Sequence, residues 1–296
     1  MQEDYIDSFS VHVNQQQFPF LKEYIDGNPR KPKSIGAENM NTNAVIQTML
    51  EHKSIRKYTD QKPSDETVQT IVRAGQQAPF ATQCYSILLS RNKKRNPWNA
   101  PLLFTICVDA HKFELIMAKR KWKIVMNDLA FLFFGIQDAA YMAQNMVTAA
   151  RSLGLGSCFL GSAMYRADKI AEEYCLPKRV FPLVQLTMGY PAEDPPPRPR
   201  YPMEFTLFED KYNELDDKTV SKAMKKMDEG YLAQDYYRKA KYMIPLEGGR
   251  KETFTFDNYS WTEHICRKLG QWDPDPKDLL QQLEKRGFHV TKKKEE

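Results

Sequence analysis

The chain has few cysteines, and they are not arranged for cross-links or metal binding. The five are odd in number, widely spaced and form no Cys-x-x-Cys pair; they are Cys84, Cys107, Cys158, Cys175 and Cys266. A disulfide framework, a zinc site and an iron–sulfur cluster are therefore not indicated, and no bound metal is expected. Because this usage is typical of a reducing compartment, we expect a cytoplasmic location.

Long apolar runs and a large excess of one charge are also missing. The longest apolar run, residues 129–136, is too short for a membrane span, which needs about 20 residues. Residues 1–10 carry three acids and no apolar stretch, so no signal peptide is expected. The 43 basic residues are interspersed with 38 acidic ones, which argues against a dedicated nucleic-acid binder. The 42% hydrophobic and 12% aromatic content indicates an ordered protein of enzyme size.

Two short basic clusters, far apart in the sequence, stand out. Residues 52–56 read His-Lys-Ser-Ile-Arg, and Arg198-Pro199-Arg200 closes a proline-rich stretch. Cations at alternate positions on a stiff backbone can point at one small dianion, and a guanidinium forks onto phosphate. If the clusters meet, they form a phosphate site suited to flavin mononucleotide (FMN) without a glycine-rich loop. Taken singly, each is more often a solvated loop or the charged end of a surface helix.

The spacing of the apolar residues predicts an alternation of helices and short strands. Ser64 is expected to cap one helix and Gly154 to end another. Strands are expected near 86–90, 102–108, 155–161 and 181–188, with an edge strand at 253–256. Helices are expected near 45–52, 64–75, 127–152, 167–174, 215–241, 261–269 and 276–286.

The longest predicted helix, 127–152, is apolar on most of its circumference, so it should lie at the centre of one subunit or of a dimer. We divide the chain into an N-terminal extension (1–42), a core (43–202) and a C-terminal extension (203–296). The C-terminal extension has too little apolar content for a core of its own. It should therefore pack over its own subunit or wrap around a partner.

Several stretches, in order along the chain, resemble the flavin-dependent nitroreductase superfamily. The chain is most similar to the branch containing oxygen-insensitive NADPH nitroreductases and NAD(P)H:FMN oxidoreductases. The stretches are residues 52–56, 83–87, 138–145, 152–156, 176–177, 189–192, 198–200, 261–265 and 287–288. No single stretch is specific, but their ordered series is.

This resemblance implies an α+β fold, with a nitroreductase-like mixed β-sheet flanked by helices in an intertwined homodimer. It implies FMN as cofactor and NAD(P)H as co-substrate. Two electrons would pass by ping-pong hydride transfer to nitroaromatic, quinone or free flavin acceptors. The chemistry would reside at flavin N5, so no side chain is expected to be catalytic. Small molecules and a second copy of the chain are the expected partners, with no nucleic acid and no membrane.

The resemblance also assigns cofactor contacts, residue by residue. His52, Ser54 and Arg56 match phosphate and ribityl contacts, and Arg198 and Arg200 would complete the phosphate grip. Thr82, Gln83 and Ser86 fall on a loop that reaches the flavin across the dimer interface. The backbone of the segment Cys158, Phe159, Leu160 and Gly161 would lie along the isoalloxazine ring. The chain is shorter than the family between Ser90 and Asn99, where Trp98 and Asn99 would replace a flavin-contacting glutamine.

Three further residues are candidates for substrate binding. Trp122 and Tyr165 would be aromatic lids over the flavin, although aromatic residues more often fill a core. Arg238 would bind the NADPH phosphate, although a solvated helix face explains it equally well. Two other functions also remain open at this point. One is another flavin enzyme on the same fold, a reductive dehalogenase or a flavin-consuming enzyme; the other is a non-catalytic FMN-binding protein in which residues 1–42 block the nicotinamide.

Overall fold

The computed structural model describes residues 42–291. The chain divides into two units, Met1–Asn43 and Ala44–Glu296, and the description below concerns the second. The predicted N-terminal extension lies outside the described residues, apart from Thr42. Of the helices within residues 42–291, none combines the length and the apolar character that crossing a bilayer requires.

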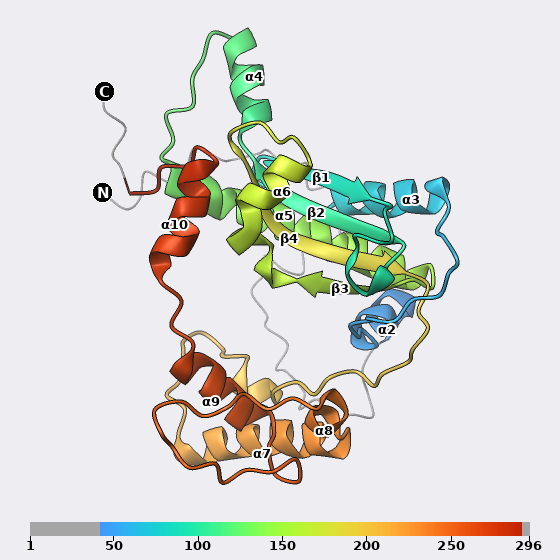
Figure 1. Ribbon diagram of the computed structural model, residues 1–296, viewed down its shortest axis with the longest axis vertical. Helices are drawn as coiled ribbons and strands as arrows, with labels where there is room; N and C mark the ends of the chain where they lie inside the picture. The colour runs from blue at the N-terminus through green and yellow to red at the C-terminus, as the bar shows by residue number, and fades with distance from the viewer. Residues whose placement is uncertain (1–41, 292–296) are drawn as a thin grey trace, which may run out of the picture. The chain divides into compact units, whose positions relative to one another are not determined.

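Four strands form one antiparallel sheet in the order β1-β2-β4-β3 (Figure 1). The strands are β1 (Tyr85–Ser90), β2 (Leu102–Asp109), β3 (Gly156–Leu160) and β4 (Val180–Gly189). The predicted mixed sheet was therefore wrong for the described residues. Their only parallel pairing is an isolated bridge between Ser54, in the segment that runs beside β3, and Ser157 of β3.

The helix α5 (Asp128–Ser152) packs against β1, β2 and β3, and α6 (Ala167–Glu173) packs against β4. Two helices, α2 (Ala44–Leu50) and α3 (Asp65–Gln76), pack on α5, and α10 (Pro276–Lys285) packs on α6. The helix α4 (His111–Lys119) projects away from the sheet (Figure 1). Ser64 caps α3 as predicted, because its side chain accepts a hydrogen bond from the Thr67 backbone N–H. The side chain of Asn127 caps α5 in the same way, and Gly154, with φ +79°, follows the end of α5 as predicted.

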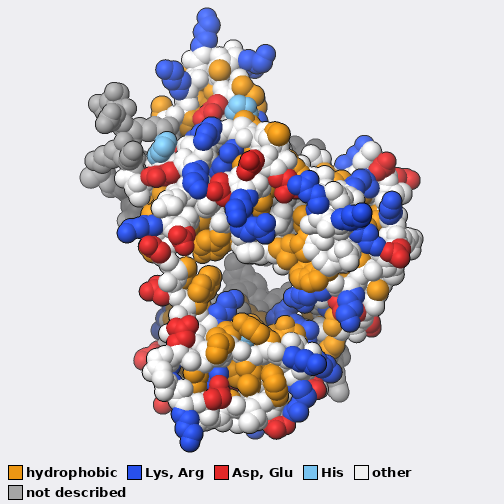
Figure 2. Space-filling view, in the orientation of Figure 1, with side chains coloured by type: hydrophobic (Ala, Val, Ile, Leu, Met, Phe, Trp, Pro, Cys, Tyr) orange, Lys and Arg blue, Asp and Glu red, His pale blue; other side chains and the backbone are white. Residues whose placement is uncertain are grey.

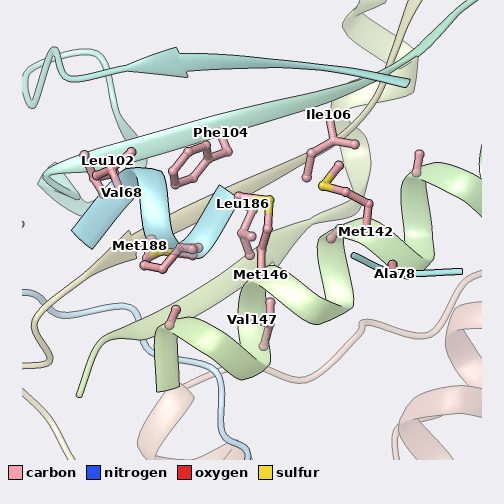
Figure 3. Packing of buried hydrophobic residues seen from close by; sticks show 14 of the residues in the cluster. Val68, Ala78, Leu102, Phe104, Ile106, Met142, Met146, Val147, Leu186 and Met188 are labelled. Atoms are coloured by element: carbon pink, nitrogen blue, oxygen red, sulfur yellow. The ribbon is translucent and has the colours of Figure 1, made fainter. Parts of the chain in front are cut away.

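The main core lies between α5 and the sheet (Figure 3). Met142 and Met146 of α5 point toward Ile106 of β2 and Leu186 of β4, and all four are fully buried. Each buried methylene group contributes roughly 0.8 kcal/mol to the free energy of folding, so such side chains supply much of the stability of a domain this size. The sheet and α5 therefore form a rigid support for the loops around them.

The C-terminal part forms a small aromatic core. Its helices are α7 (Asp217–Ala233), α8 (Tyr236–Ala240) and α9 (Trp261–Gln271). The core consists of Met227, Tyr231, Tyr237 and Tyr259, with five partly buried hydrophobic neighbours. The expectation that residues 203–296 have no core of their own was wrong, because a few large aromatic rings bury as much surface as many aliphatic side chains. On the face shown in Figure 2, hydrophobic side chains gather over α7–α9 among charges of both signs.

Two local predictions in this part were also wrong. The single helix expected at 215–241 is broken at Asp235, whose φ of 53° is left-handed. Residues 253–256 form no strand, because the carboxylate of Glu252 accepts the Thr253 and Phe254 N–H groups that a partner strand would need.

Candidate functional site

The segment after α2 pairs with the loop after β4. The Thr59 N–H donates to the Tyr190 carbonyl at 2.9 Å, and the Ala192 N–H donates to the Lys57 carbonyl at 2.9 Å. On its other side this segment meets β3, because the Ile55 N–H donates to a β3 carbonyl at 2.9 Å. The two distant stretches that carry the basic clusters therefore run side by side.

Two acids in the proline-rich loop hold the first basic cluster in place. A carboxylate oxygen of Glu193 accepts the backbone N–H groups of Arg56 at 2.6 Å and Lys57 at 3.1 Å. Asp194 forms an ion pair with Lys53. Glu193 was not singled out by the sequence analysis, and only its place within the matched 189–200 stretch could have pointed to it.

Arg200 of the second cluster and Arg151 of α5 lie close enough to His52 to affect its ionisation. Burial, together with the positive charges of Arg200 and Arg151, lowers the pKa of His52 below its ordinary value of 6.5. The two stretches that carry the clusters therefore lie together, whereas the role of their residues as phosphate ligands stays a prediction. Arg151, in the last turn of α5, is a cation that the sequence analysis missed, since nothing in the local pattern marks it.

The guanidinium groups of Arg56 and Arg200 have no carboxylate partner among residues 42–291. Arg200 donates through Nη1 to the carbonyls of Arg198 and Pro199, at 3.0 and 3.1 Å. Arg56 lies over the ring of Trp98, with its Cζ 5.7 Å from the ring centroid. These charges therefore remain available to an anion.

Arg198 is turned toward the C-terminal helices. Its Nη1 donates to Gln234 Oε1 at 2.6 Å, and its Cζ lies 4.0 Å from the centroid of the Tyr236 ring. Beside it, a Cβ added to Gly230 of α7 would lie 2.6 Å from Pro199, so only glycine permits this approach. Arg198 thus ties the proline-rich loop to α7 and α8.

The end of β3 lies open beside these cations. Phe159 is 39% exposed, and a Cβ on Gly161 would meet no atom within 4 Å. Cys158 is buried, and burial raises the pKa of its thiol against the opposing influence of Arg56 and the Ser54 hydroxyl. A neutral thiol is a poor nucleophile, so this segment offers backbone and apolar surface, not a reactive group.

The loop before β1 is fixed by Asp138 of α5, which is fully buried. Its carboxylate accepts the backbone N–H groups of Ala81 at 2.6 Å, Thr82 at 3.0 Å and Cys84 at 3.1 Å. Gln83, between these donors, is exposed and left-handed, with φ 59°. Asp138 lies in a matched stretch, but its role as an acceptor for this loop was not foreseen.

The pKa of Asp138 yields a test of this loop. Burial alone would raise that pKa, but the three N–H donors hold it below its ordinary value of 3.8. A depressed folded pKa stabilises the protein above the unfolded value, and this stability is lost as the pH falls through the folded pKa. We expect Asp138→Asn to lower the free energy of unfolding at pH 7 by about 2–4 kcal/mol. The gap to the wild type, measured by urea unfolding, should narrow below pH 3.8; a gap independent of pH would contradict the assignment.

The remaining predicted residues lie in several places. Ser86 donates its hydroxyl to Asp109, within the sheet. Trp122 is 70% exposed and lines an apolar pocket of about 320 Å³ together with Thr82. Tyr165 packs edge-on against Trp272, with ring centroids 6.5 Å apart.

Arg238 forms ion pairs with Asp235, at 3.0 Å, and with Asp257. Two carboxylates thus offset the charge that the sequence analysis assigned to the NADPH phosphate. Asn99, with φ 50°, follows Trp98 in the loop between β1 and β2.

One face of α5 and α2 is apolar and exposed. The exposed apolar side chains are Val45, Met49 and Leu50 of α2 and Leu129, Phe133, Phe134, Ile136 and Tyr141 of α5, each between 40% and 60% exposed. A contiguous apolar surface of this kind marks a protein–protein interface more often than a solvent-facing helix.

A protein family and two curated relatives match this sequence. The sequence matches the Nitroreductase family over residues 49–91 and 88–190. It is 28% identical to the oxygen-insensitive NADPH nitroreductase of Salmonella typhimurium, over 76% of this chain and 90% of that protein. It is 31% identical to the FMN reductase (NADPH) of Bacillus subtilis, over 77% of this chain and 92% of that protein.

A solved structure matches as well. NfrA1 of B. megaterium aligns with a TM-score of 0.70 and 29% identity, over 83% of this chain and 99% of that one. The first basic cluster, the loop before β1 and the whole of β3 fall within the family match, whereas the proline-rich loop that carries Arg198 and Arg200 lies just beyond it.

Proposed function

This chain belongs to the nitroreductase family, and we propose that it is an FMN-dependent NAD(P)H oxidoreductase. Its relatives are named NADPH nitroreductase and FMN reductase, so we assign nitroaromatic compounds, quinones or free flavin as the electron acceptors. The same site would serve the nicotinamide and the acceptor in turn, in a ping-pong sequence.

The observation that carries this proposal is that the two basic stretches run side by side, with Arg200 close enough to His52 to lower its pKa. The guanidinium groups of Arg56 and Arg200 have no carboxylate partner among the described residues. Gathering like charges is unfavourable unless an anion offsets them. A phosphate ester fits this set, because guanidinium groups bind its oxygens in pairs and the Ser54 hydroxyl adds a donor.

In our proposal, different residues of this site bind different parts of FMN. His52, Ser54, Arg56 and Arg200 bind the phosphate, and the open end of β3 supports the ring. Flavin, when bound, supplies two-electron chemistry at its N5 atom. The neutral thiol of Cys158 and the apolar surface of Phe159 keep this side of the site free of competing nucleophiles.

We also propose that the active form is a homodimer. The apolar face of α2 and α5 supports this, because exposed apolar side chains gathered on a helix face commonly mark a protein–protein interface. The loop that Asp138 fixes begins beside this face, so Thr82 and Gln83 would reach the partner's flavin. The segment 203–272 is held to the phosphate loop through Arg198.

The proposal is tested on the purified chain. We expect a yellow protein whose visible spectrum is that of bound FMN, bleached anaerobically by NADPH or NADH. Adding a nitroaromatic compound, a quinone or free FMN should restore the colour, and initial rates should give parallel double-reciprocal plots.

Two outcomes would contradict the proposal. A colourless protein that does not take up FMN would show that FMN is not its cofactor. A yellow protein that neither nicotinamide reduces would instead indicate a non-catalytic FMN-binding protein.

A further inference from the structure

The loop between β1 and β2 holds a costly conformation. Trp98 has φ 54° and ψ 26°, and Asn99 has φ 50°, so two consecutive residues with side chains are left-handed. For a bulky residue such as tryptophan this is a genuine outlier, and such strain persists only where the surrounding structure imposes it. The side chain of Asn96 adds a second cost, because its Oδ1 is buried and has no hydrogen-bond partner among residues 42–291.

The surroundings impose this conformation from both sides. Asn96 is 4% exposed and donates through Nδ2 to the carbonyls of Ala100 at 2.8 Å and Ser90 at 3.3 Å. Pro101, directly after the loop, packs so closely on Gly189 that a Cβ there would lie 2.5 Å from the proline ring. The loop therefore cannot relax without disturbing the sheet.

Packing of the Trp98 ring does not explain the conformation, since the side chain is 41% exposed. The strained backbone instead places the indole beside Arg56, 5.7 Å from guanidinium carbon to ring centroid. Arg56 is fixed at its backbone by Glu193, and its side chain has no carboxylate partner among residues 42–291. Among residues 42–291, the ring of Trp98 is thus the group that holds this guanidinium.

We propose that Trp98 is a positioning residue for the phosphate of the flavin, acting through Arg56. An aromatic ring against the face of a guanidinium attracts the cation but leaves the N–H donors along its edge free. The indole would therefore hold Arg56 in one orientation, with its edge presented to the phosphate, and reduce the side-chain entropy lost on binding. This inference rests on the proposed function, since it takes FMN as the ligand.

The test compares two ligands that differ only in the phosphate. The apoprotein is titrated with FMN and with riboflavin, and the Kd values are read from the quenching of flavin fluorescence. We expect Trp98→Ala to raise the Kd for FMN about tenfold and to change that for riboflavin less than about twofold. Trp98→Phe, which keeps a ring, should stay within about threefold of the wild type for both ligands.

A double mutant decides whether Trp98 acts through Arg56. Arg56→Ala alone should weaken FMN binding more than Trp98→Ala does, and adding Trp98→Ala to it should change the Kd little further. Tyr242→Ala serves as a control, because Tyr242 is also an exposed aromatic residue and its ring contacts none of the predicted flavin-binding residues, and it should leave both Kd values unchanged. Trp98→Gly should weaken FMN binding like Trp98→Ala yet unfold at no lower urea concentration than the wild type, because glycine relieves the left-handed strain.

The outcomes separate this inference from the proposed function. A wild-type protein that binds no FMN would overturn both. Wild-type binding with an unchanged Kd for Trp98→Ala, or equal losses for FMN and riboflavin, would overturn the role of Trp98 alone. Additive effects of Trp98→Ala and Arg56→Ala would show that the indole does not act through Arg56, and would overturn the inference as well.

Discussion

Replacing Arg198 and Arg200 together by alanine is expected to yield a folded protein that purifies without colour. Arg200 lies with His52 and would bind the phosphate directly. Arg198 is held by Gln234 and the ring of Tyr236, so its loss would free the loop that carries Arg200. A guanidinium can bind a phosphate through two charge-assisted hydrogen bonds of about 1.5–3 kcal/mol each, so the loss of Arg200 from the site should cost roughly 3–6 kcal/mol of FMN affinity. This corresponds to a loss of about two to four orders of magnitude in Kd.

The measurement is the flavin absorbance of the purified protein, followed by titration of the apoprotein with FMN. Arg73→Ala with Arg120→Ala is a matched control, since both arginines are exposed, lie outside the site and remove the same charge. That variant should purify yellow. A fully yellow, active Arg198→Ala/Arg200→Ala protein would contradict the assignment of the phosphate site.

The single variants Arg200→Ala and Arg198→Ala should differ in their resistance to proteolysis. Arg200→Ala should weaken FMN binding and leave the protease resistance of residues 203–272 as it is. Arg198→Ala should also loosen this segment, because its guanidinium connects the proline-rich loop to α7 and α8. Limited proteolysis, measured together with the FMN titration, therefore distinguishes Arg198, which anchors residues 203–272, from Arg200, which binds the phosphate. Equal proteolysis of both variants would argue against these separate roles.

Replacing Phe133 and Ile136 by glutamate is expected to give a monomer that has lost its flavin. Both side chains are exposed on α5, at 60% and 41%, so the change removes little from the subunit's own core. Burying two carboxylates in an apolar interface without partners costs several kcal/mol each, which exceeds what a typical dimer can absorb. Since Thr82 and Gln83 are proposed to reach the partner's flavin, dissociation should also remove FMN contacts.

Sedimentation velocity gives the oligomeric state, and circular dichroism checks that the subunit is still folded. Phe133→Leu with Ile136→Leu keeps the face apolar, so this control should remain dimeric and yellow. If the glutamate variant stays dimeric, then the apolar face of α2 and α5 is not the interface. A folded monomer that retains FMN at wild-type affinity would instead contradict the proposed contribution of the loop that Asp138 fixes.

Local signals in the sequence were sufficient for much of the fold. The cap at Ser64, the strands before and after residue 100 and the long helix α5 appear within a few residues of their predicted positions. Periodicity and capping depend on neighbours within one or two turns, so they can be read from the chain directly. The predictions failed where a local turn interrupts the periodicity, as at the left-handed Asp235 and at residues 253–256, where the adjacent Glu252 side chain accepts the first two N–H groups.

The chain by itself determined which charged and apolar side chains are available: two basic clusters, an exposed helix face and an open segment at the end of β3. Only the tertiary structure decided how they are used. It turned Arg198 toward Tyr236, brought Arg151 to His52 and forced Trp98 into a left-handed conformation beside Arg56. The reason is that the direction of a side chain depends on contacts made across the fold, and these contacts have no counterpart in the local sequence pattern.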